Sequence, residues 1–175
     1  MLNLSMLIEH HARIHPDREA IVAGPVRLTY AQLDGAACRV AGALAALGVK
    51  PGDHVALSCP NTSHFPIAYF GILKTGAAVV PLNVLLKPRE IAQHLRDSAA
   101  RAYLCYEGTA ELPIAQMGHA AFGEVESCEQ FVVMTKDPAA ASPVAGTPTL
   151  DALVHAAPAA FETVLRAPDD TAVIL

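Results

Sequence analysis

Apolar residues recur at a helical spacing between Thr29 and Gly48, which is the strongest structural signal in the chain. The apolar positions of this stripe are Leu33, Ala37, Val40, Leu44 and Leu47. They follow one another every three or four residues, so they share one face of a helix. Thr29 and Gln32 have the spacing of a capping box at the start of this helix, and Gly48 suits its carboxyl end.

Short apolar runs and helical patterns alternate along the rest of the chain, separated by Gly and Pro. The expected strands are residues 20–23, 54–58, 77–80, 102–106, 131–134 and 172–175. The other expected helices are residues 4–14, a helix capped by Thr62 or Ser63 and ending at Thr75, one beginning at Pro88, and residues 112–121 and 150–155. Strand–helix alternation with short connections predicts an α/β fold, a doubly wound and mainly parallel sheet flanked by helices.

Composition removes several classes of protein. The chain has 175 residues, of which 53% are hydrophobic and 17% charged, and its formal net charge is -5. A disordered chain would have few apolar residues and a high net charge. A nucleic-acid partner would favour a basic excess, so none is expected here. The length suggests a single domain with a core of its own.

The cysteines indicate a reducing compartment. The chain contains Cys38, Cys59, Cys105 and Cys128. None forms a Cys-x-x-Cys pair, which disfavours zinc ribbons and thioredoxin-type sites, and four cysteines are too few for a disulfide scaffold. We therefore interpret them as reduced thiols that act as small apolar side chains.

No targeting or membrane segment is evident. No basic residue precedes the first apolar stretch, which argues against a secretory signal. Residues 65–86 are mostly apolar but contain Pro66, Lys74, Gly76 and Pro81, and this pattern favours a helix, a turn and a strand over one continuous span. We expect a cytoplasmic protein without a transmembrane segment.

Two patterns resemble binding motifs without matching them. The stretch from Gly71 to Gly76 has its lysine before the second glycine, unlike a phosphate-binding loop, so Lys74 is interpreted as complementing the dipole of a helix that Gly76 ends. His11 and His15 have a metal-ligand spacing next to Glu9, but no third ligand follows. A solvated helix face explains the histidines better.

The remaining candidates also lack partners. His54 and His64 flank a central strand, where one of them could face a pocket, although a structural or surface role is favoured. Ser58 has no nucleophile-elbow context, and the adjacent Asp169 and Asp170 point to opposite sides of an extended chain. The residues themselves therefore assign no catalytic, cofactor-binding or metal-binding site.

The last residues read as a buried strand with no turn behind it. Ala172 to Leu175 are all apolar, whereas natural termini are usually polar and exposed. Ligand sites in doubly wound folds lie in the loops that follow such strands. We therefore expect residues 1–175 to be the N-terminal α/β portion of a larger domain, truncated at its C-terminal end.

A succession of turns and caps is spread over most of the chain. Its pieces are Leu28-Thr29-Tyr30, Leu47-Gly48-Val49, Pro51-Gly52-Asp53, Pro60-Asn61-Thr62, Lys74-Thr75-Gly76-Ala77, Val80-Pro81-Leu82-Asn83, Asp97-Ser98 and Asp170-Thr171-Ala172 with Ile174-Leu175. This succession resembles the N-terminal part of the adenylate-forming (AMP-binding) enzymes, which include acyl-CoA synthetases, luciferases and peptide-synthetase adenylation domains. Each piece is weak by itself, and their order and spacing together carry the resemblance.

The resemblance implies a ligase that activates a carboxylic acid, by default a fatty acid, with Mg²⁺ and ATP and passes the acyl group from acyl-adenylate to coenzyme A. It also implies that the catalytic motifs lie beyond Leu175, so the isolated chain is expected to be inactive and to bind no cofactor. A carrier-protein thiol as acceptor remains an alternative. A stand-alone α/β binding or interaction module is another, and oligomerisation through uncovered apolar surface also stays open.

Overall fold

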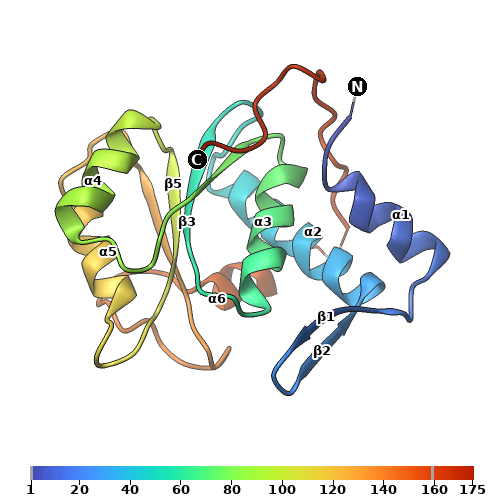
Figure 1. Ribbon diagram of the computed structural model, residues 1–175, viewed down its shortest axis with the longest axis horizontal. Helices are drawn as coiled ribbons and strands as arrows, with labels where there is room; N and C mark the ends of the chain where they lie inside the picture. Colours follow the sequence, from blue (N-terminus) through green and yellow to red (C-terminus); the bar gives the residue numbers. More distant parts are fainter. Residues whose placement is uncertain (1, 159) are drawn as a thin grey trace.

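The computed structural model describes residues 2–158 and 160–175, and its centre is a four-stranded sheet in which all neighbouring strands are parallel (Figure 1). The strands are β4 (Ala78–Pro81), β3 (His54–Ser58), β5 (Ala102–Tyr106) and β6 (Gln130–Met134), in that spatial order. This confirms the predicted α/β fold with a doubly wound parallel sheet.

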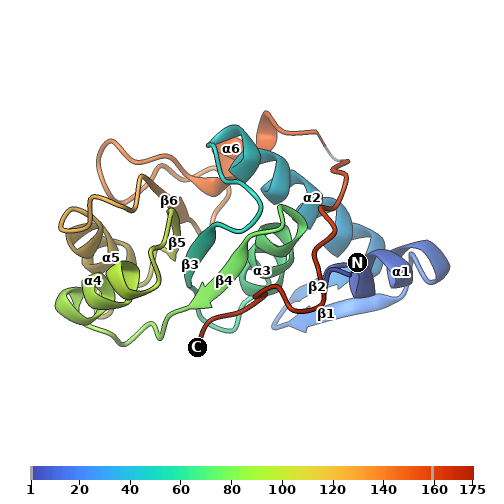
Figure 2. The ribbon, with the colours of Figure 1, turned by 90° about the horizontal axis from the view of Figure 1, so that it is seen from above.

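Helices cover both faces of this sheet. The helices α2 (Tyr30–Ala46) and α3 (His64–Lys74) pack together on one face, and α4 (Pro88–Asp97) and α5 (Ile114–Phe122) pack together on the other (Figures 1 and 2). This follows from handedness, because right-handed crossovers that leave β3 and β4 in opposite directions must place their helices on opposite faces. The strands are accordingly buried on both sides.

The predicted start of α2 is confirmed in detail. Gln32 donates its backbone N–H to the Thr29 hydroxyl at 3.3 Å, and its side chain accepts from the Thr29 backbone N–H at 2.9 Å. These reciprocal bonds satisfy two groups that a helix start otherwise leaves unpaired. The apolar stripe from Leu33 to Leu44 is buried, as the spacing predicts.

A hairpin beside α2 was only half predicted. The strand β1 (Glu19–Ala23) pairs antiparallel with β2 (Val26–Thr29), outside the central sheet and close to α1 (Met6–Ile14) (Figure 2). The sequence analysis predicted the first strand and interpreted Gly24-Pro25 only as its end. The second strand is short and half-exposed, so it lacks the apolar run that identified the others.

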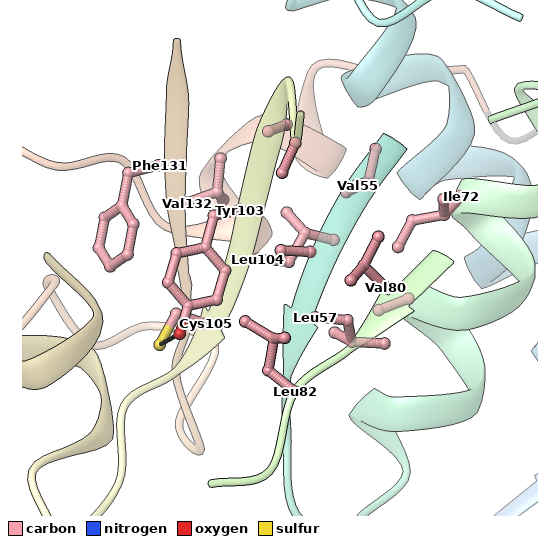
Figure 3. Packing of buried hydrophobic residues seen from close by; sticks show 14 of the residues in the cluster. Val55, Leu57, Ile72, Val80, Leu82, Tyr103, Leu104, Cys105, Phe131 and Val132 are labelled. Atoms are coloured by element: carbon pink, nitrogen blue, oxygen red, sulfur yellow. Dashed lines mark hydrogen bonds between the residues drawn. The ribbon is translucent and has the colours of Figure 1, made fainter. Parts of the chain in front are cut away.

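The core is mainly apolar and contains a hydrogen-bonded pair of buried hydroxyl groups. Tyr103 and Phe131 lie on neighbouring strands with ring centroids 5.4 Å apart in an edge-to-face arrangement (Figure 3). The Tyr103 hydroxyl lies 2.7 Å from Ser58 Oγ, so each satisfies the other away from water. All four cysteines are buried and free, as predicted.

Some predicted bounds shift. The helix expected at residues 4–14 begins at Met6. The helix expected to end at Thr75 begins at His64, and no side chain caps its start. The helix expected at 112–121 is α5, which begins two residues later than predicted. The short helix α6 (Leu150–His155) matches its prediction. No helix in the described ranges is long and apolar enough to cross a bilayer.

The expected buried strand at residues 172–175 is wrong in its extent. Only Val173 forms a bridge, parallel to Val79 of β4, and Leu175 is fully exposed. Val79 donates to Ala172 O and Ile174 donates to Val79 O, both at 2.9 Å. The segment therefore begins to extend the sheet along β4, but no strand forms because a single bridged residue is not a ladder.

Candidate functional site

The connections leaving β3 and β5 run in opposite directions across the sheet. β3 leads through α3 to β4 on one side, whereas β5 leads through α5 to β6 on the other. In open parallel sheets the loops diverge at such a point and leave a crevice at the carboxyl ends of the two strands, where ligands bind. This edge is the candidate functional site of the chain.

Four side chains meet at this edge, and we refer to them as the switch-point cluster: Cys59, Thr62, His64 and Tyr106. The Thr62 hydroxyl lies 3.4 Å from His64 Nδ1 and 3.7 Å from Cys59 Sγ. The His64 ring lies 5.5 Å from the Tyr106 ring, measured between centroids. The sequence analysis singled out His64, and the structure places it just after β3, beside Tyr106 at the carboxyl end of β5.

The helix α6 adds a carboxyl group next to this cluster. Thr149 caps α6 by accepting from Ala152 N at 3.3 Å, and it also forms a bridge to Val133 of β6, which fixes the helix start. Burial raises the pKa of Asp151, although the nearby His64 opposes the shift. A carboxyl with a raised pKa beside an imidazole exchanges protons closer to neutral pH than an exposed aspartate does. Sequence reasoning missed Asp151, because nothing local distinguishes it.

The cluster offers hydrogen-bonding groups but no activated nucleophile. Burial raises the pKa of Cys59 to about 11, so this thiol stays protonated near neutral pH. Ser58 is only 1% exposed and its hydroxyl is engaged with Tyr103. The edge can therefore bind a polar group, whereas it holds no side chain prepared to begin covalent catalysis.

The histidines of α1 have a different environment from the one predicted. His11 is half-buried, with its ring 4.9 Å from Tyr30 and 6.0 Å from His15, so only part of this helix face is solvated. Glu9 turns away from the histidines toward Lys74. Among residues 2–158 and 160–175, no group of three or more His, Cys, Asp or Glu side chains is arranged to hold a metal ion.

The other candidates have structural contacts. His54 lies at the opposite end of β3 from His64, with its Nδ1 2.5 Å from Ser98 O. Asp170 accepts from Ala167 N at 2.9 Å and pairs with Arg166 at 3.1 Å. Neither residue contributes to the switch-point cluster.

Lys74 makes contacts that its sequence interpretation did not include. Its side chain is 1% exposed, and its Nζ lies 2.5 Å from Glu9 Oε1 and 2.9 Å from Asp34 Oδ1. Burial acts to lower the pKa of Lys74, but the hydrogen bonds to Glu9 and Asp34 outweigh burial and raise it. Lys74 lies in the last turn of α3, as the interpretation as a dipole complement requires, and its ammonium is in addition a buried, paired charge.

The buried thiols lead to a direct prediction about reactivity. Burial raises the pKa of Cys59 to about 11 and those of Cys105 and Cys128 to about 12, from an ordinary value of 9.0. Because the thiolate is the reactive form, Ellman's reagent at pH 8 should leave the native protein unlabelled and should label all four cysteines in denaturant. Rapid labelling of any one of these three cysteines in the native protein would contradict their burial. Above pH 9 the unfolded thiols ionise first, so stability should fall with rising pH.

Comparison with known proteins assigns the family. Residues 8–175 match the family described as AMP-binding enzyme. The chain is 37% identical over 106 residues to the long-chain-fatty-acid–CoA ligase FadD13 of Mycobacterium tuberculosis, which covers 59% of this chain and 21% of that protein. It is 39% identical over 103 residues to an oxalate–CoA ligase of Arabidopsis thaliana, covering 58% of this chain and 20% of that protein.

Solved structures share the fold along nearly the whole chain. An anthranilate CoA ligase in complex with anthranoyl-AMP aligns with a TM-score of 0.87 and 25% identity, over 98% of this chain and 31% of that one. A Mycobacterium tuberculosis fatty acyl CoA synthetase aligns with a TM-score of 0.79 and 28% identity, over 98% of this chain and 32% of that one. The chain thus spans about a fifth of the length of these curated relatives and about a third of these solved chains. It belongs to the family of AMP-binding, adenylate-forming enzymes.

Proposed function

We propose that this chain is the N-terminal portion of a cytoplasmic, ATP-dependent acyl-CoA synthetase, which activates a carboxylic acid as acyl-adenylate and transfers it to coenzyme A. The observation that supports it is the family match over residues 8–175 together with the common fold of CoA ligases. A fatty acid is the proposed substrate, because long-chain-fatty-acid–CoA ligases are among the relatives.

Within this proposal the described residues act as a scaffold. No metal-holding group of acidic side chains is present in the ranges that the structure describes, and the switch-point cluster contains no lysine or arginine for a triphosphate. These residues do not fit Mg²⁺ and ATP, and no step of the reaction is assigned to them. We propose that residues 1–175 contribute no catalytic residue and that they position segments that do.

A chimera tests the scaffold role directly. Residues 8–175 would replace the matching part of the Mycobacterium tuberculosis long-chain-fatty-acid–CoA ligase, and the readout would be formation of long-chain acyl-CoA. We expect activity to be retained, since the graft supplies the same fold. The host lacking this part is the negative control, and a folded but inactive chimera would contradict the proposal.

The isolated chain provides the opposite test. It should catalyse no ATP–pyrophosphate exchange with any fatty acid, and measurable exchange would show that it contains catalytic residues after all. The coding sequence after Leu175 distinguishes the ligase hypothesis from the hypothesis of a stand-alone module. A Ser/Thr/Gly-rich loop ending in Lys-Gly would support the ligase, whereas an immediate stop codon would overturn it in favour of a stand-alone module.

A further inference from the structure

Lys74 joins four segments that are far apart in the sequence. At the end of α3, its buried ammonium contacts Glu9 of α1 and Asp34 of α2, and it donates to Thr163 Oγ1 at 3.3 Å. Thr163 also donates its hydroxyl to Glu9. We refer to these four residues as the Lys74 clasp. A fully buried lysine is rare unless paired, and here two carboxylates pair with the single ammonium.

Backbone and amide contacts around the clasp fasten the same segment. We define residues 160–174 as the C-terminal strap, which Figure 2 shows running beside α1 toward the edge of β4. Asn3 donates its side-chain amide to Leu73 O at 2.6 Å and to Val164 O at 2.9 Å. Val164 donates to Lys74 O at 2.9 Å, and Leu2 and Arg166 exchange backbone hydrogen bonds at 2.9 and 3.1 Å.

Apolar burial holds the strap only weakly. Leu165 is 46% exposed, and residues 167–171 are exposed throughout. Ala172 and Ile174 are half-buried against the main core, and they reach β4 only through the two hydrogen bonds at Val79. Phe161, Val164 and Val173 are also only half-buried. The polar contacts near Lys74 are therefore an attachment that the strap's apolar side chains do not replace.

We propose that Lys74 is a positioning residue whose ion pairs hold α1 and the C-terminal strap as one detachable unit against α2 and α3. Loss of the ammonium leaves two carboxylates close together and half-buried without a cation, which is costly for the elements that carry them. The sheet is buried in one apolar cluster to which α2, α3, α4 and α5 all contribute, and none of the four clasp residues belongs to that cluster. The strap should then open without unfolding of the sheet, as a separate cooperative unit.

Amide hydrogen exchange by NMR tests this in the chain itself. In Lys74→Met, protection of the strap amides of Val164, Arg166 and Ile174 should fall by roughly 100-fold. This is the size expected when half-buried carboxylates lose the cation that pairs with them. Amides of β5 and β6 should keep their protection. Lys136→Met, which removes an exposed lysine, should change neither set.

Two further variants separate a clasp from general packing. Leu104→Ala should lower protection in the sheet while strap amides, which exchange by local opening, change little. Adding Glu9→Gln and Asp34→Asn to Lys74→Met should restore much of the strap protection, since no unpaired charge remains. If Lys74→Met does not fold, Thr163→Val removes only the strap's own link and should release the strap alone. Equal losses in strap and sheet, or an unchanged strap, would overturn the proposal.

Discussion

Gly71→Ala is expected to destabilise the protein by about 1–3 kcal/mol, although alanine is the better helix former. Gly71 lies where α3 crosses α2. A Cβ on Gly71 would lie 2.5 Å from Val40 Cγ1 and 3.1 Å from the backbone oxygen of Ala37. The backbone oxygen cannot rotate away, and Val40 is itself 1% exposed, so the two helices must separate. Urea unfolding measured by circular dichroism would report the change.

The same substitution at Gly35 is the matched control. Gly35 lies within α2, and a Cβ there would meet nothing within 4 Å, so Gly35→Ala should stabilise the protein by about 0.5–1 kcal/mol. Val40→Ala removes the methyl group at 2.5 Å but keeps the Val40 Cβ, which would lie 2.6 Å from the Gly71 Cβ, so the clash is only partly relieved. The double variant should therefore be somewhat more stable than the sum of the single effects predicts. Additive effects, or a stable Gly71→Ala, would show that the helices do not pack this closely.

Local signals allowed most of the fold to be predicted. The capping box of Thr29 and Gln32, together with the apolar stripe, defined α2 because all the information lies within one helix. Buried parallel strands such as β5 are uninterrupted apolar runs and were equally plain. β2 was missed because its exposed and half-buried residues have no such run. Segment 172–175 was overpredicted, because apolar sequence alone does not supply a neighbouring strand.

The candidate site depends on contacts that the sequence does not display. His64 was singled out, but its neighbours Tyr106 and Asp151 come from other elements and meet it only at the sheet edge. Lys74 was interpreted only as a complement to its helix dipole, because Glu9 and Thr163 are 65 and 89 residues away from it in the chain. Such pairings arise from tertiary packing, whereas periodicity and caps report only on the element that contains them.

Gly108→Ala is expected to have the larger effect, a loss of about 2–5 kcal/mol, with about 1–2 from left-handed backbone strain and about 1–3 from overpacking. Gly108 follows β5 at the candidate site and has φ +85°. A Cβ there would lie 2.2 Å from Leu112 O and 2.5 Å from Ile114 N, both backbone atoms. Leu112 O accepts from Thr109 N at 2.9 Å, so the clash breaks the turn that begins α5.

Gly146→Ala separates the two contributions to this loss. Gly146 also has a left-handed φ, +76°, but a Cβ there would meet nothing within 4 Å, so its cost should be the strain of about 1–2 kcal/mol alone. Urea unfolding of both variants gives the steric part as the difference. Glu107, next to Gly108, accepts a hydrogen bond from Lys136 N at 2.9 Å. Disrupting the turn should therefore loosen the loop after β6 as well. Equal losses of unfolding free energy in the two variants would mean that the turn after β5 relaxes freely around the added Cβ. The candidate site beside this turn would then be less rigid than its hydrogen bonds indicate.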